Sequence, residues 1–308
     1  MGEITAALVP ILVPILVGLG LKRARFLSDD AWEGLEKLTY FVLFPCLLVR
    51  TLGAQSVAGV PWPGMLVAIA GTLLTAAALL TLWHRLRASV PGPTFTSIFQ
   101  GGVRFNSYIA LAVAQTFFGD AGLALAAVAA GFMIVIINLL CIAALAAWGH
   151  ARVRGVVPLA RAVFGNPLIL ACAVGWALSL SGIGVSGVAD KVLEVLGRAA
   201  LPLGLLAVGA ALQPESMQRH LEPAAVSSLV QFGAKPLIAA LMIGITGLTG
   251  VPAIVLAIAL STPTATSSYI LARQLGGDAP AMASIITFQT LAAFLVMPVV
   301  ILWWTGNV

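Results

Sequence analysis

The sequence predicts an all-α membrane protein of ten transmembrane helices, arranged as two inverted five-helix repeats. Three observations lead to this fold class. Of the 308 residues, 60% are apolar and only 9% are charged, whereas about a quarter are charged in soluble proteins. The chain forms a series of apolar runs of about 20 residues, the length that a helix needs to cross a bilayer. Similar short motifs also recur in both halves, in the same order.

Such a low content of charge excludes several classes of protein. A soluble globule could not cover its surface with so few charges, so a cytosolic enzyme, a nucleic-acid binder and a disordered regulator are excluded. The net charge of +5 is explained better by basic cytoplasmic loops than by a nucleic-acid partner. The three cysteines fall in apolar runs, without a CxxC or Cys/His cluster. We therefore expect no disulfide, no metal and no cofactor.

The apolar runs define ten candidate spans. They cover about 4–21, 34–54, 62–83, 94–118, 121–148, 165–182, 188–212, 223–247, 252–275 and 280–305. These runs do not alternate between apolar and polar residues, which excludes a membrane barrel. Basic residues concentrate in the odd-numbered loops. Because cytoplasmic loops carry the excess of Lys and Arg, both termini are expected on the outer side.

An internal repeat supports the same architecture. The segment NSYIALA at 106–112 resembles SSYILA at 267–272, and Pro45 and Pro202 precede similar Leu-rich motifs at almost the same interval. Since each repeat has five helices, the second enters the membrane from the opposite side. The predicted segments are the first repeat at 1–150, a cytoplasmic linker at 151–164 and the second repeat at 165–308.

The fourth span carries an expected break. Gly101 and Gly102 weaken the helix midway and are the expected hinge. Arg104, Asn106 and Ser107 follow within a few residues. Polar groups at this depth are expected to face a protein interior or a cavity.

The ninth span carries a matching break. Thr262 and Pro263 are typical of a helix that restarts, with Thr as the N-cap and Pro as hinge at the first helical position. Hydroxyl groups follow at Thr264, Thr266 and Ser267. Two breaks at equivalent repeat positions suggest that the helices cross near the midplane, where the N-terminal ends of the second halves would attract a carboxylate.

The ionisable residues point to an anionic ligand. No acidic residue lies in the middle of a span, whereas Lys235 lies halfway along the eighth and Arg104 follows the Gly pair. A buried Lys235 needs an anion or carbonyl partners, and the Phe232 carbonyl is one candidate because Pro236 cannot donate to it. Alternatively, Lys235 supplies positive potential to an anionic substrate, or stands where a coupling cation would sit.

Other polar residues in the spans have simpler explanations. Arg50, near the end of the second span, is expected to snorkel to the membrane surface. Asn138 and Gln289 are expected to make hydrogen bonds between helices rather than to bind a ligand.

Several segments resemble the auxin efflux carrier family, the PIN-like transporters. The quoted matches are FPCLLVRTLG, FNSYIALA, LPLGLLAVGAAL and TPTATSSYILARQLGGD. The resemblance implies a scaffold domain, a transport domain and crossing fourth and ninth helices, as in bile-acid-symporter-like folds. Asn106 matches an asparagine of the first crossover and Pro263 the proline of the second. Many relatives have a proline in the fourth span, where this chain has Gly101, Gly102 and Arg104.

The chain lacks the long cytoplasmic loop of the plant hormone exporters, and it looks like a bacterial member of the family. Such relatives are generally assigned to small organic anions such as malonate or malate. The resemblance thus implies a protein of the bacterial cytoplasmic membrane, and it leaves a homodimer open.

Residues and resemblance together predict a secondary transporter of a small organic carboxylate. The expected substrate site consists of Asn106, Ser107, Thr264, Thr266 and Ser267, with Arg104 and Lys235 setting a positive potential. A sodium-coupled symporter of the same fold is one alternative, although no intramembrane carboxylate is present to bind the ion. A ligand-sensing membrane module that does not transport is another. An enzyme is not expected, because neither HExxH nor GxSxG occurs.

Overall fold

The computed structural model describes residues 2–54, 59–87, 89–150 and 165–306, so the linker predicted at 151–164 lies outside the described residues. All regular elements in these ranges are helices. Within the same ranges, six stretches of helix are long and apolar enough to cross a membrane. The prediction of an all-α membrane protein is therefore confirmed for the described residues.

The described part of the first half contains six numbered α-helices and one π-helix. They are α1 (Gly2–Arg23), α2 (Asp29–Leu38), η1 (Thr39–Leu43), α3 (Phe44–Gly53), α4 (Trp62–Leu86), α5 (Gly92–Val103) and α6 (Ser107–Trp148). Helix α2 begins earlier than the span predicted at 34–54, because the Ser28 hydroxyl caps it by accepting a bond from the Ala31 N–H. The helix widens to η1 just before Pro45, which has no N–H to donate.

The helices that the structure describes in the second half of the chain are shorter and more numerous than those in the first half. Its elements are α8 (Pro167–Leu180), α9 (Gly187–Arg198), α10 (Ala200–Ala210), α11 (Pro214–Met217), η3 (Gln218–His220), α12 (Leu221–Ser228), η4 (Leu229–Ala234), α13 (Lys235–Thr246), α14 (Gly250–Ser261), α15 (Ser267–Leu275) and α16 (Ala279–Gly306). The single span predicted at 188–212 comprises α9 and α10, which are interrupted at Ala199. A second π-helix, η4, again lies just before a proline, Pro236.

Helix α6 turns back on itself at Gly119. This residue has a φ of +59° and a ψ of −149°, which only glycine adopts easily. A Cβ atom on Gly122 would lie 2.4 Å from the Ala114 carbonyl oxygen, although eight residues of straight helix span about 12 Å. The chain therefore reverses between the spans predicted at 94–118 and 121–148.

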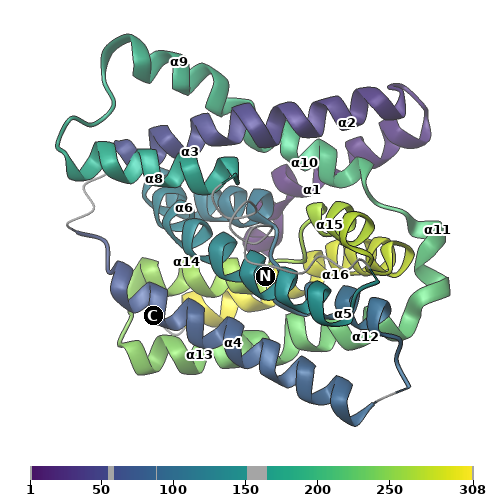
Figure 1. Ribbon diagram of the computed structural model, residues 1–308. Helices are drawn as coiled ribbons and strands as arrows, with labels where there is room; N and C mark the ends of the chain where they lie inside the picture. The colour runs from purple at the N-terminus through teal and green to yellow at the C-terminus, as the bar shows by residue number, and fades with distance from the viewer. Residues whose placement is uncertain (1, 55–58, 88, 151–164, 307–308) are drawn as a thin grey trace.

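The helices associate in two groups (Figure 1). In the first group, α1 packs on α10, and α3 packs on α8 and α9. In the second group, α4 packs on α13, α5 on α12 and α16, and α14 on α6. Helix α6 also contacts α1, α3, α8 and α10, so it lies between the groups. Both broken helices belong to the second group.

Two glycines allow α1 and α10 to pack with their backbones in contact. A Cβ atom on Gly209 would lie 1.8 Å from the Ile15 carbonyl oxygen, and one on Gly18 would lie 2.0 Å from that of Leu206. No larger residue could occupy either position without separating the helices. Small residues at such contacts are typical of helix packing in membranes.

Candidate functional site

Helix α5 ends and α6 begins at the first break. Arg104, Phe105 and Asn106 are not helical. Asn106 starts α6 as its N-cap, with its side-chain oxygen accepting a bond from the Ile109 N–H at 3.1 Å. This use of the oxygen leaves the amide nitrogen of Asn106 to donate to a ligand.

The Gly pair lies before this break and not in it. Gly101 and Gly102 are both inside α5. A Cβ atom on Gly101 would lie 2.7 Å from Ile285 and 2.8 Å from Ser227, and one on Gly102 would lie 2.8 Å from Leu80. These glycines therefore let α5 approach its neighbours closely, and the chain leaves the helix after Val103.

Helices α14 and α15 form the second break. Residues 262–266 are not helical, and Thr262 ends α14 instead of starting the next helix. Its hydroxyl donates to the Ala259 carbonyl at 2.9 Å. The helix restarts at Ser267, with Thr266 as N-cap. Pro263 stands at the start of the interruption, where it removes a backbone donor.

The two breaks are in direct contact. The backbone N–H of Asn106 donates to the Thr262 hydroxyl at 3.3 Å. In the other direction, the Thr264 hydroxyl donates to the Gln100 carbonyl at 3.4 Å. Non-helical segments of the two halves of the chain thus pair with each other in the interior, where they are shielded from lipid.

Two glutamine side chains make hydrogen bonds to backbone groups at the broken helices that have no partner within a helix. Gln289 of α16 accepts a bond from the Thr264 N–H at 2.9 Å and donates to the Gly101 carbonyl at 3.0 Å. Gln231 of η4 donates to the Thr262 carbonyl. Both side chains are fully buried. Gln289 thus makes the hydrogen bonds between helices that the sequence predicts, and it bonds to the last turn of α5 and to the backbone of the second break.

Lys235 is fully buried beside the first break. Its Nζ atom lies 3.1 Å from the Arg104 carbonyl, 3.3 Å from the Val103 carbonyl and 2.6 Å from the Gln231 side-chain oxygen. The carbonyl partners belong to the last residue of α5 and to the first break, whereas the candidate Phe232 lies in η4, just before Lys235. Lys235 therefore has carbonyl partners, as one of the expectations requires. They are the carbonyls of Val103 and Arg104 and not that of Phe232.

Arg104 reaches from the first break to the second. One Nη atom lies 3.3 Å from the Ser267 hydroxyl, and the other lies 3.4 Å from the Asn138 side-chain oxygen. Its buried Nε atom has no hydrogen-bond partner among the described residues. Arg104 also makes no ion pair with any residue that the structure describes. The hydrogen-bond partners of this guanidinium among the described residues are therefore neutral.

The other predicted site residues lie around this arginine. Thr264 is fully buried, and its hydroxyl lies 3.2 Å from that of Ser268. Thr266 is 8% exposed, and Glu36 of α2 interacts with its hydroxyl. Ser107 is half-buried at the first position of α6. The structure thus brings all the predicted residues to one region, although Lys235 contacts the backbone of the break and not its polar side chains.

Gln100 belongs to the polar cluster that the sequence shows at the first break, but it is not among the predicted site residues. Its side chain is fully buried, and neither amide atom has a partner among the described residues. It precedes Arg104 by four residues, and Arg104 is the residue directly after the end of α5. Gln231 likewise precedes Lys235 by four residues. This spacing between a glutamine and a cation is the signal that could have pointed to Gln100 and Gln231 as site residues.

A cavity of about 590 Å³ lies between helix α6 and the helices α1, α3, α9 and α10 of the first group. Its polar lining includes Arg50, Gln115, Asp120, Glu194 and Arg198. It reaches α6 at Ala112, between one and two turns beyond the Asn106 cap. The break residues themselves are not part of its wall.

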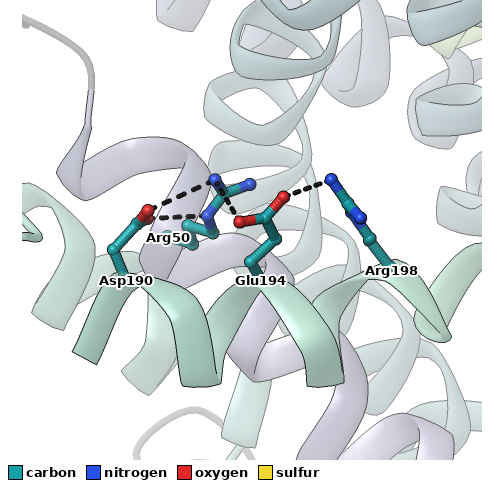
Figure 2. Close-up of polar contacts among 4 residues, drawn as sticks. All are labelled: Arg50, Asp190, Glu194 and Arg198. Atoms are coloured by element: carbon teal, nitrogen blue, oxygen red, sulfur yellow. Dashed lines mark hydrogen bonds and ion pairs between the residues drawn. The ribbon is translucent and has the colours of Figure 1, made fainter. Parts of the chain in front are cut away.

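Arg50 is held by acidic residues at this cavity (Figure 2). Its Nε atom lies 2.7 Å from Asp190, and one Nη atom lies 3.4 Å from Glu194, which also pairs with Arg198. Besides the expected snorkelling, Arg50 joins α3 to α9 by ion pairs. The partners lie 140 residues away in the chain, so no local pattern could reveal them.

Comparison with known proteins places the chain in a family of transporters. Residues 3–301 match the family described as membrane transport protein. The chain belongs to this family. It is the family of auxin-efflux-carrier-like transporters that the motifs resemble, and it is a family of transporters and not of enzymes. This transporter is also 24% identical, over 299 residues and 96% of each chain, to an uncharacterized transporter of Methanothermobacter thermautotrophicus.

The membership and the apolar helices together identify a multi-pass membrane protein that acts in transport. In this transporter, backbone that is not helical occurs where two discontinuous helices meet. Such places commonly bind substrates in secondary transporters.

Proposed function

We propose that this transporter moves a small organic anion by alternating access around the two contacting breaks. The substrate would be a carboxylate such as malonate or malate, or an auxin-like weak acid. The observation that carries the proposal is Arg104, a cation at the first break whose described partners are all neutral. A carboxylate would supply the charge that those partners lack.

The donors at the breaks suit a carboxylate. The unpaired Nε atom of Arg104 and the hydroxyl of Ser267 would bind one carboxylate group. The N-terminal ends of α6 and α15 begin at Ser107 and Ser267, and both carry partial positive charge. Asn106, Thr264 and Thr266 would add donors around the ligand. Lys235 contributes positive potential from behind the first break.

The proposed topology has ten membrane-spanning units in two inverted repeats, 1–150 and 165–308, with both termini outside the bacterial cytoplasmic membrane. In this arrangement the end of α1 and the segment before α12 both face the cytoplasm. An ion pair of 2.7 Å between Arg23 and Glu215 supports their common side.

Access would alternate by movement of one helix group against the other. The group that contains α1, α3, α8, α9 and α10 would act as scaffold, and the group that contains both breaks would carry the substrate. The cavity of about 590 Å³ between α6, which begins at the first break, and the first helix group supports such movement, because close packing is interrupted there. Glu36 contacts Thr266 from the scaffold side, so it would have to release this hydroxyl when substrate binds.

The test is transport by the purified protein in proteoliposomes. We expect uptake of labelled malonate, malate or indole-3-acetate, and loss of at least about 90% of that uptake in Arg104→Gln, since a charge-assisted bond contributes about 1.5–3 kcal/mol. Arg85→Gln is the matched control, because Arg85 is an exposed arginine on α4. Its uptake should equal that of the wild type.

Two results would overturn the proposal. Full uptake by Arg104→Gln would show that the site is elsewhere. Saturable binding of these acids without any flux would favour the ligand-sensing alternative. Uptake that stops when sodium is replaced by potassium at fixed pH would instead establish the sodium-coupled alternative.

A further inference from the structure

The buried amine of Lys235 is surrounded by a particular set of atoms. Its three hydrogen-bond partners are the carbonyl oxygens of Val103 and Arg104 and the side-chain oxygen of Gln231, at 3.3, 3.1 and 2.6 Å. All three atoms accept hydrogen bonds, and none carries a formal charge. The residue has no exposed surface, so water does not replace any of these partners.

The number of acceptors matches the charged form of the amine. An ammonium group has three N–H donors and no acceptor. The orientation of Gln231 is set independently, because its amide nitrogen donates to the Thr262 carbonyl and its oxygen must then face Lys235. Three donors therefore meet three acceptors, and every polar atom in this group is used.

The position of these acceptors favours the ammonium form of the side chain. Val103 is the last residue of α5, so its carbonyl belongs to the helix end that carries partial negative charge. Carbonyl oxygens of this kind replace the hydration shell of a bound ion in potassium channels. Carbonyls at helix ends and unwound backbone also bind the coupling cation in many secondary transporters.

We propose that Lys235 fills a monovalent-cation site of the carbonyl type, so that its own ammonium group takes the place of a bound ion. The tethered cation neutralises the end of α5 and, through Gln231, joins it to the Thr262 carbonyl of the second break. An ion that stays attached to the chain cannot be carried across the membrane. This site therefore stabilises the crossing without coupling transport to a cation gradient.

The proposal is tested by emptying the site and supplying a free cation. Lys235→Ala removes three carbons and the amine, which together correspond to propylammonium. We expect Lys235→Ala in detergent to have a lower Tm than the wild type and to regain about 5 °C with saturating propylammonium chloride. Ammonium and potassium chloride should give smaller rises, because they lack the apolar chain.

The controls separate this effect from general salt or solvent effects. Choline chloride, which is too large, and neutral 1-propanol should leave the Tm of Lys235→Ala unchanged. Lys235→Met fills the same space without a charge, so it should be destabilised and insensitive to propylammonium. The wild type should keep its Tm within about 1 °C when sodium chloride is replaced by choline chloride, since its site is already filled.

Two results would overturn the proposal. One is an equal response of Lys235→Ala to propylammonium and to choline. The other is a response of the wild type that equals that of Lys235→Ala. If both variants are too unstable to purify, the yield after extraction is measured with and without propylammonium. Recovery of Lys235→Ala but not of Lys235→Met would support the proposal, and recovery of neither would refute it. Stability is the readout, so the outcome is independent of the substrate assignment.

Discussion

The side-chain oxygen of Gln289 lies 2.9 Å from the backbone N–H of Thr264, at a point where α14 has ended and α15 has not begun. The same side chain donates to the Gly101 carbonyl of α5 at 3.0 Å. One residue of α16 therefore satisfies a backbone donor of the second broken helix and a backbone acceptor of the first. Both groups are buried, where an unpaired polar group is costly.

We predict that Gln289→Leu is strongly destabilising. The leucine would leave the Thr264 N–H and the Gly101 carbonyl without this partner, at a cost of about 2–4 kcal/mol. Thermal unfolding of the protein in detergent measures the effect. The matched control is Gln115→Leu on α6, an exposed glutamine at the cavity, which should change stability by less than about 0.5 kcal/mol. Equal losses in both variants would contradict the assigned role of Gln289.

The contact between α1 and α10 gives a second prediction. Gly209→Ala would place a methyl group within 1.8 Å of the Ile15 carbonyl oxygen. The helices must separate to admit it, so we expect a loss of about 1–3 kcal/mol in thermal unfolding.

A glycine on α13 provides the control for this substitution. A Cβ atom on Gly244 would have no heavy atom within 4 Å. Because alanine restricts the unfolded chain, Gly244→Ala should be neutral or stabilising by up to about 1 kcal/mol. If Gly209→Ala were as stable as Gly244→Ala, the close approach of α1 and α10 would be refuted.

The third prediction concerns acid stability at the pair of Arg23 and Glu215. A hydrogen bond from its own backbone N–H, and then the Arg23 guanidinium, hold the pKa of Glu215 below its ordinary value of 4.5. A lowered folded-state pKa stabilises the protein above the unfolded value, and this contribution is lost as the pH falls through the folded value.

Glu215→Gln should therefore be less stable than the wild type at pH 7, and the difference should shrink as the pH falls below 4.5. Unfolding curves of both proteins between pH 7 and pH 3 measure this change. Glu222→Gln is a suitable control, because Glu222 is an exposed acid whose ion pair with Arg87 is longer, at 4.0 Å. A difference that stays constant over this pH range would disprove the linkage.

The sequence predicts the class of fold and the location of both breaks, because these depend on local properties. Apolar runs mark the helices, and Asn106 and Pro263 mark interruptions through capping and a missing donor. The burial of Lys235 also follows from its position within an apolar run. The role of Gly101 and Gly102 differs from the expected one, since a glycine can serve close packing as well as flexibility.

Long-range partners could not be predicted in the same way. Lys235 meets the carbonyl of Val103 across 132 residues, and Arg50 meets Asp190 across 140. Which residues form such pairs depends on how the helices pack, and no short pattern in the sequence specifies this. Gln231 escaped notice for the same reason, although its spacing from Lys235 places both on one helix face.

The packing of α1 on α10 has a consequence for how the protein is made. The ribosome releases α1 first, yet the surface that receives Gly18 is complete only after the chain has been synthesised as far as Gly209, out of 308 residues. Until then α1 must remain in the bilayer without the helix against which it packs most extensively. Its final docking is therefore a late event in biogenesis, and a chain truncated before α10 should leave α1 open to degradation by membrane proteases.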